Sequence, residues 1–104
     1  MTEEQVFQTI KQLAHSVLPK GSSLWLYGSR ARGEQHEGSD WDLLILLDKD
    51  HISARDHDFA YPFSELGWEI GEDISPHLYA RKQWDTWTFL PFYKNVERDK
   101  IVLL

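Results

Sequence analysis

Five consecutive apolar residues at positions 43–47 (Leu-Leu-Ile-Leu-Leu) constrain the fold of this chain more than any other feature. The run is far shorter than a membrane span of roughly 20 residues. Its length between turn signals is typical of a strand that is buried on both faces. Asp-x-Asp tripeptides lie on either side of it, at Asp40–Asp42 and at Asp48–Asp50. We therefore expect a strand over 41–47, in a sheet that is covered by helices.

The rest of the chain supplies elements that fit around this strand. Thr2 and Gln5 are spaced as a helix capping box, Pro62 predicts a break or kink in a helix, and Pro76 predicts an edge strand or a bulge. The expected elements are, in chain order, a helix over 2–18, a strand over 23–27, a helical turn over 29–33, a polar loop over 34–39, the strand over 41–47, a helix from Ser53 to about Leu66, a strand over 72–79, two short helices (or one bent helix) over 81–87 and 91–98, and an apolar tail over 101–104 that docks as a strand or contributes to an oligomer contact. This order predicts a single α/β (α+β) domain over 1–104, with a small mixed sheet flanked by helices.

Asp40 and Asp42 are the first candidates for a functional site. Residues two apart on a strand point to the same face, so their carboxylates project together and repel each other unless a cation lies between them. Carboxylate oxygens suit Mg²⁺, which usually takes its other ligands from waters and substrate phosphates. The alternative is a solvated turn beside a strand, as at Asp48 and Asp50.

A Gly-Ser turn, Gly28-Ser29, ends the preceding expected strand. Glycine lets the backbone approach a ligand closely, and the amides at the start of a following helix favour an anionic phosphate. An ordinary strand-to-helix turn with Ser29 as the cap would use the same residues, and both interpretations can hold together. A phosphate-binding turn beside metal-binding carboxylates indicates nucleotide chemistry.

The combined pattern resembles that of the DNA polymerase beta-type nucleotidyltransferase superfamily, and within it the minimal nucleotidyltransferases (MNT). The family pattern is Gly-Ser, about ten residues, then Asp-x-Asp, and Gly28, Ser29, Asp40 and Asp42 fill it. Residues that commonly accompany the motif are also present, namely Arg30, Arg32, Gly33 and Ser39. Several minimal nucleotidyltransferases are antitoxins that are paired with HEPN-domain toxins.

This resemblance implies a polymerase beta-like palm core and a Mg²⁺-dependent reaction. A nucleoside monophosphate, most simply AMP from ATP, would be transferred to a hydroxyl with release of pyrophosphate. Gly28, Ser29, Arg30 and Ser39 would hold the nucleotide. Arg30 and Arg32 are two apart, so only one of them is expected to face the ligand, and Arg30 is preferred.

The family mechanism normally uses a third carboxylate, which comes from a later strand. Glu72 and Asp73 lie at that place, and Asp73 is the better candidate because it begins the alternation that continues through Ser75 and His77. The predicted metal-binding and catalytic set is therefore Asp40, Asp42 and Asp73. If Ser75 occupies the third position instead, the third ligand is missing.

Composition narrows the partners and the compartment. The chain has no cysteine, which excludes disulfides and thiolate metal sites, and its start lacks the basic and apolar stretches of a signal peptide. These features predict a soluble, cytoplasmic protein. A formal net charge of −6 argues against nucleic acid as the main partner. It suits a nucleotide held through metal ions or a basic protein, and it equally suits a simple need for solubility.

The remaining histidines and tryptophans are expected to be structural. The five histidines have no recognisable metal-ligand spacing, although His77 could line the site. The five tryptophans are expected in the core, with Trp41 pointing away from the two aspartates.

Two classes of function follow from the sequence. The first is a nucleotidyltransferase whose acceptor brings its own surface, such as a tyrosine hydroxyl on a HEPN-type partner toxin. The second is a non-catalytic, antitoxin-like module that binds the nucleotide or the partner by contact alone, with a homo-oligomer as a further option. An orphan relative of the fold with a lost substrate is also compatible with the sequence.

Overall fold

The fold is built around a mixed sheet of four strands, in the order β3-β2-β1-β4. The computed structural model describes all residues 1–104. The elements are α1 (Glu3–Val17), β1 (Ser23–Tyr27), α2 (Ser29–Arg32), β2 (Trp41–Leu47), the 3₁₀ helix η1 (Ala54–Phe59), α3 (Tyr61–Ile70), β3 (Ile74–Ala80), α4 (Arg81–Thr86), α5 (Pro91–Asp99) and β4 (Ile101–Val102). This arrangement confirms the expected mixed sheet flanked by helices.

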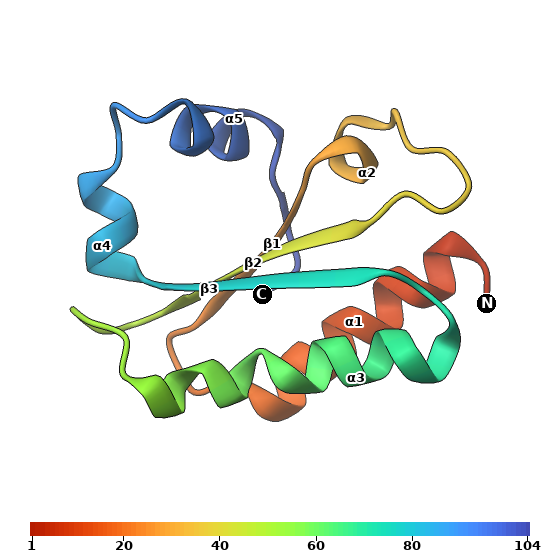
Figure 1. Ribbon diagram of the computed structural model, residues 1–104, viewed down its shortest axis with the longest axis horizontal. Helices are drawn as coiled ribbons and strands as arrows, with labels where there is room; N and C mark the ends of the chain where they lie inside the picture. The colour runs from red at the N-terminus through yellow and green to blue at the C-terminus, as the bar shows by residue number, and fades with distance from the viewer.

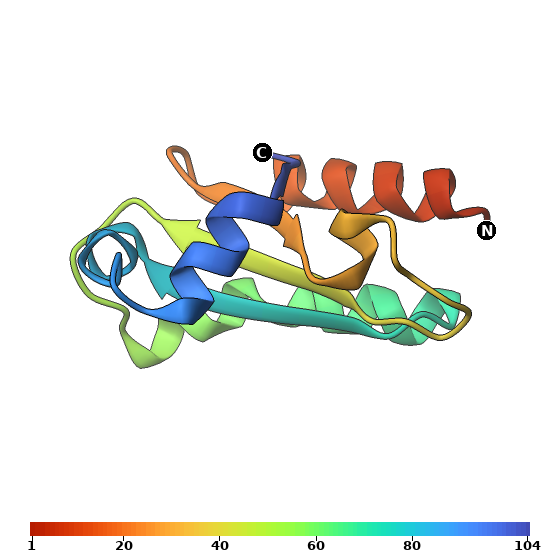
Figure 2. The ribbon, with the colours of Figure 1, turned by 90° about the horizontal axis from the view of Figure 1, so that it is seen from above.

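Helices cover the sheet on both faces, with α1 and α3 on one side and α4 and α5 on the other (Figures 1 and 2). The α1/α3 side packs around Leu43, Ile45 and Phe63, and the α4/α5 side packs around Trp25 and Trp84. Because β2 contributes alternate residues to both cores, every residue from Leu43 to Leu47 is buried. The continuous apolar run is therefore explained by its central place in the sheet.

The sheet register determines which side chains share a face. β1 runs antiparallel to β2 and pairs Tyr27 with Asp42, whereas β3 runs parallel to β2 and pairs Asp42 with Ser75 and Leu44 with His77. Side chains of paired residues lie on the same side of a sheet. Tyr27, Asp42, Ser75 and His77 thus belong to the α4/α5 face.

The helix that was expected from Ser53 to Leu66 is wrong in its bounds. The chain forms the short η1 first, and Pro62 then occupies the second position of α3, which continues to Ile70. Proline is tolerated in a first helical turn because the N–H it lacks would have no partner within the helix there. The expected break is therefore present, between η1 and α3, and Pro62 lies directly after it in the first turn of α3.

Other expectations about local structure hold. Thr2 and Gln5 form the capping box of α1, and Pro76 lies in an edge strand, where a missing backbone N–H is tolerated. The C-terminal tail docks as β4 against β1. None of the helices is both long enough and apolar enough to cross a bilayer.

One of the five tryptophans contradicts the expected core position. Trp25, Trp41 and Trp84 are buried and Trp87 packs against the second core, but Trp68 is 70% exposed. Trp68 lies on the outer face of α3, whose inner face carries Phe63 and Gly67. The helical period distinguishes the buried face of α3 from its exposed face. The general expectation that tryptophan is buried does not make this distinction.

Candidate functional site

The two motif segments meet at one end of the sheet, which we call the motif end. β1 ends there at Tyr27, and the chain turns through Gly28 into α2. It returns to the sheet after Asp40, where β2 begins (Figure 1). Since Tyr27 and Asp42 are paired across the antiparallel ladder, the Gly-Ser turn and the aspartates lie beside each other. The structure therefore brings together Gly28, Asp40 and Asp42.

The backbone at Gly28 explains why this position is glycine. Its φ of 77° lies in the region that L side chains rarely adopt. A Cβ built there would overlap with Oδ2 of Asp42 and would lie 3.2 Å from its Cγ. The Asp42 carboxylate thus packs directly against the turn that precedes α2.

Burial and like charge act together on Asp42. Partial burial raises its pKa first, the charge of Asp40 raises it further, and His77 and Arg32 oppose the rise. Burial and the nearby Asp42 charge also raise the pKa of the Tyr27 hydroxyl above its ordinary value. Neither aspartate has a hydrogen-bonding or ion-pairing cation, so the motif end carries uncompensated negative charge that a bound cation would relieve.

Arg30 forms its ion pair with Glu3 and forms none with either aspartate. Its guanidinium donates to the carbonyl oxygen of Ser39 from Nε (3.0 Å) and Nη2 (2.7 Å), pairs with Glu3 at 2.7 Å, and lies over the ring of Trp41. Trp41 belongs to the α1/α3 face, opposite Asp42, as expected. These contacts assign Arg30 to anchoring the loop between α2 and β2, and they do not support the predicted phosphate contact.

Ser39 has a similar anchoring position. It is buried, and its hydroxyl accepts from the backbone N–H of His36 at 2.9 Å. Arg32 is the arginine whose charge reaches Asp42. Its guanidinium also contacts Glu34 at 3.2 Å and Asp99 of α5 at 3.4 Å. Of the two arginines, Arg32 is therefore the better placed for an anion at this site.

The third carboxylate is not gathered with the other two. The register pairs Ser75 with Asp42, and Asp73 precedes β3 with its carbonyl accepting from Trp41 N–H at 2.8 Å. No three acidic or histidine side chains come together as a metal-binding group. The third-ligand role of Asp73 stays a prediction, and its alternative, Ser75, faces Asp42.

A cavity of about 240 Å³ lies on the β3 side of the aspartates. Its lining residues come from the start of β2, from α3 and from β3, namely Asp40, Ser64, Trp68, Glu72, Asp73, Ile74 and Ser75. Sequence reasoning missed Ser64 and Trp68. A helix register over 61–70 would have indicated both, because residues at spacings of three, four and seven share a helix face.

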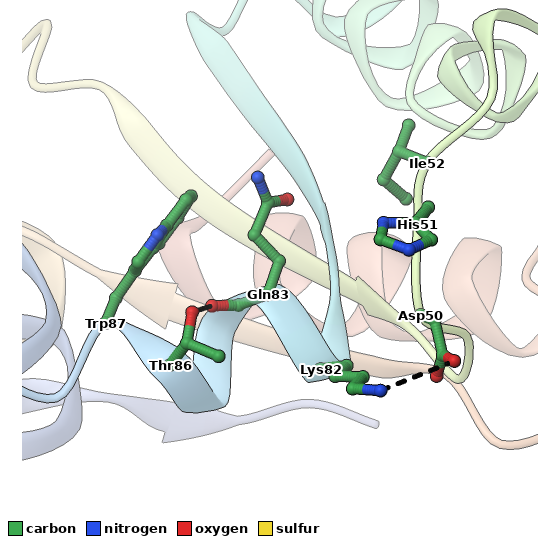
Figure 3. A pocket seen from close by; sticks show the side chains of 7 residues that line it. All are labelled: Asp50, His51, Ile52, Lys82, Gln83, Thr86 and Trp87. Atoms are coloured by element: carbon green, nitrogen blue, oxygen red, sulfur yellow. Dashed lines mark hydrogen bonds and ion pairs between the residues drawn. The ribbon is translucent and has the colours of Figure 1, made fainter.

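A larger cavity of about 530 Å³ lies at the opposite end of the sheet, between the chain that follows β2 and α4 (Figure 3). Lys82 and Asp50 form an ion pair of 3.6 Å across it. None of the sequence-predicted site residues lines this cavity. Its chemistry is thus separate from that of the motif end.

Comparisons with solved structures agree with this arrangement. A toxin–antitoxin complex with AMP-PNP contains a chain that matches with a TM-score of 0.65 at 20% identity, covering 94% of this chain and 72% of the other. A MntA–HpeT toxin–antitoxin variant with two aspartate-to-glutamate changes matches with a TM-score of 0.63 at 17% identity, covering 94% and 71%. A MntA–HpeT variant with a tyrosine-to-alanine change matches with a TM-score of 0.62 at 20% identity, covering 100% and 73%. At these identities the likeness establishes the fold.

No curated protein matches the sequence significantly. The domain family described as nucleotidyltransferase domain matches residues 5–103, which is almost the whole chain. The chain therefore belongs to the nucleotidyltransferase domain family, and its fold is that of MNT-type proteins.

Proposed function

We propose that this protein transfers AMP from ATP to a hydroxyl of an acceptor in a Mg²⁺-dependent reaction. The observation that carries the proposal is the position of Asp42, which is half-buried beside Asp40, packs against the Gly28 turn and forms no ion pair. Two carboxylates in this position suit Mg²⁺, which is held by one or two protein carboxylates together with substrate phosphates. The donor set of the site thus fits the metal.

Each residue of the motif end has a part in this proposal. Asp40 and Asp42 would hold Mg²⁺, with Asp73 as the predicted third ligand. The bound metal would neutralise phosphate charge during transfer. Gly28 keeps the turn free of a side chain, so that phosphate oxygens can approach the backbone, and Ser29 offers its hydroxyl. Arg32 lies near enough to Asp42 to add positive charge.

The reaction exchanges a phosphoanhydride bond of ATP for a phosphoester bond to the acceptor. The acceptor oxygen bonds to the α-phosphorus of ATP, the bond from that phosphorus to the bridging oxygen breaks, and pyrophosphate leaves. The acceptor proton passes to a carboxylate of the site and then to solvent. Asp73 is the predicted base, and Asp40 lies in the same cavity.

A tyrosine hydroxyl on a HEPN-type partner toxin is the acceptor we propose. Matching structures are toxin–antitoxin complexes, one of them with AMP-PNP, and another carries a tyrosine-to-alanine change. An acceptor that brings its own surface suits a domain of this size. A cysteine-free protein that uses ATP suits the cytoplasm.

Ser75 favours a second candidate function. It stands opposite Asp42, where a third acid would complete the metal site. A protein with only two acids there would act as an antitoxin-like module that binds nucleotide or partner without transfer.

Label transfer distinguishes the two functions. The protein would be incubated with Mg²⁺, ATP and a HEPN-type protein as acceptor, with the label on the α-phosphate in one reaction and on the γ-phosphate in another. Nucleotidyl transfer labels the acceptor only in the first reaction and requires Asp42, so Asp42→Asn should abolish it. A stable complex that takes up no label, while Mg-ATP still binds, would establish the non-catalytic module.

A further inference from the structure

The two sides of the aspartate pair differ in what surrounds them. Gly28 packs against Asp42 from the β1 side, whereas the cavity of about 240 Å³ opens from Asp40 on the β3 side. Phosphoryl transfer proceeds with the attacking and leaving oxygens roughly in line. If the Gly28 turn receives the leaving phosphates, the cavity on the β3 side, which Asp40 lines, is open to the acceptor.

An exposed tryptophan lines that cavity and packs against an exposed tyrosine. Trp68 is 70% exposed and Tyr61 is 54% exposed, and their rings contact each other edge to face at 5.9 Å between centroids. Trp68 also lines the cavity together with Asp40. Neither ring contributes to either core, so the fold itself does not account for them, and exposed tryptophan is typical of binding surfaces.

The charge of this surface is one-sided. From Tyr61 to Ala80, which spans α3 and β3, the chain contains no lysine or arginine, yet it contains four acidic residues. Glu65 and Glu69 are exposed on α3. Asp40, Glu72 and Asp73 line the cavity itself. Such a surface repels the triphosphate and attracts a cationic molecule.

We propose that the α3–β3 cavity is the acceptor-binding site, and that it takes a positively charged polypeptide segment. An apolar or aromatic side chain of the segment packs on Trp68, lysine or arginine side chains face the acidic residues, and the hydroxyl is directed toward Asp40. The proposal rests on the proposed function, whose acceptor class it specifies. A base-stacking role for Trp68 is the competing possibility, and the experiment separates the two.

The test follows the indole N–H signal of Trp68 by NMR in the full chain, with Trp68→Phe used to assign the signal. The probes are acetyl-Lys-Lys-Tyr-Lys-Lys-amide, its glutamate counterpart, and α,β-methylene ATP with Mg²⁺, in which the bond that would break is blocked. The lysine peptide should shift the Trp68 signal and saturate it, and the glutamate peptide should leave it unchanged. Nucleotide alone should leave the signal in place.

Matched variants show whether the indole itself binds. Trp68→Ala should weaken binding of the lysine peptide at least tenfold, whereas Trp68→Phe should retain most of the affinity. The wild type and both variants should bind the Mg²⁺–nucleotide complex equally. Phe89→Ala is the control, because Phe89 is also 70% exposed but lies outside the cavity. It should have no effect on either ligand.

The failure modes are distinct. Equal peptide affinity in wild type and Trp68→Ala, or a Trp68 signal that responds to nucleotide and not to the lysine peptide, would overturn the acceptor site and leave the proposed transferase activity standing. Loss of Mg²⁺–nucleotide binding in the wild type would overturn the proposed function. The peptide titration without nucleotide would then still decide whether this surface binds cationic segments.

Discussion

The two ends of the β1–β2 pair carry nearly the same residues in opposite electrostatic states. At the motif end, Gly28 packs against Asp42, and at the far end, Gly21 packs against Asp48, with both glycines at positive φ. At the far end, Lys49 pairs with the carboxylate of Asp56 at 2.7 Å and Lys82 pairs with that of Asp50, while Asp48 itself has no ion pair. The motif end has no such pairs for its aspartates.

The pKa values express this difference. Lys49 and the backbone N–H of Ser53 lower the pKa of Asp56, whereas burial and Asp40 raise that of Asp42. An Asp-x-Asp tripeptide occurs at both ends of β2, so the tripeptide alone does not define a site. What distinguishes the motif end is a pair of carboxylates that the fold leaves without a cation.

The largest expected effect is on nucleotide binding. Asp40→Asn combined with Asp42→Asn should abolish Mg²⁺-dependent binding of ATP, measured by calorimetry, because the amides carry no charge for the metal. The thermal midpoint should stay equal or rise slightly, since like-charge repulsion is removed. Asp48→Asn combined with Asp50→Asn is the control and should leave ATP binding unchanged. Wild-type affinity in the first double variant would show that the site is assigned incorrectly.

The glycines provide the next comparison. Alanine at Gly28 or Gly21 would be strained by positive φ, which costs about 1–2 kcal/mol at either position. At Gly28 the new methyl would also displace the half-buried Asp42 carboxylate, whereas the exposed Asp48 can rotate away from Gly21. We expect Gly28→Ala to weaken ATP binding by more than tenfold, about 1.4 kcal/mol, and Gly21→Ala to affect only stability. Equal ATP affinity in the two variants would contradict the close packing at the motif end.

The third effect concerns the two arginines of the motif, Arg30 and Arg32. Arg30 donates to Ser39 and contacts Glu3 and Trp41, so Arg30→Ala should reduce the free energy of unfolding by about 2 kcal/mol in urea denaturation. Arg32 is more exposed, and Arg32→Ala should cost less than about 1 kcal/mol while weakening ATP binding more than Arg30→Ala does. If Arg30→Ala weakened ATP binding more than Arg32→Ala did, the phosphate-binding role that the sequence predicts for Arg30 would be supported.

The sequence was sufficient for the fold and for the central motif, because both depend on local patterns. The apolar run in β2, the capping box at Thr2 and the Gly28–Asp42 spacing each have one simple structural solution. The direction of a side chain depends on tertiary packing, which is why the expected core position of Trp68 was wrong. Arg30 turns toward Trp41, Trp68 turns outward, and the register of the parallel pair places Ser75 opposite Asp42, none of which the local sequence determines.

The smallest effect is the pH dependence of stability, which should have opposite signs at the two ends. The pKa of Asp42 is raised in the folded state, so its contribution reduces stability as the pH rises from the ordinary aspartate value through the raised one. The pKa of Asp56 is lowered in the folded state. Asp56 therefore stabilises the fold at pH values above the ordinary aspartate pKa, and this stabilisation is lost as the pH falls through the lowered pKa. Thermal midpoints would be measured from acid to neutral pH. In Asp42→Asn, the midpoint should no longer decline as the pH rises above the ordinary aspartate pKa. In Asp56→Asn, the midpoint should fall less than that of the wild type as the pH is lowered. Mg²⁺ should raise the midpoint of the wild type at neutral pH and leave that of Asp42→Asn unchanged, because the cation binds only the ionised carboxylate. If the two single variants changed the profile in the same direction, the contrast between the compensated far end and the uncompensated motif end would be wrong.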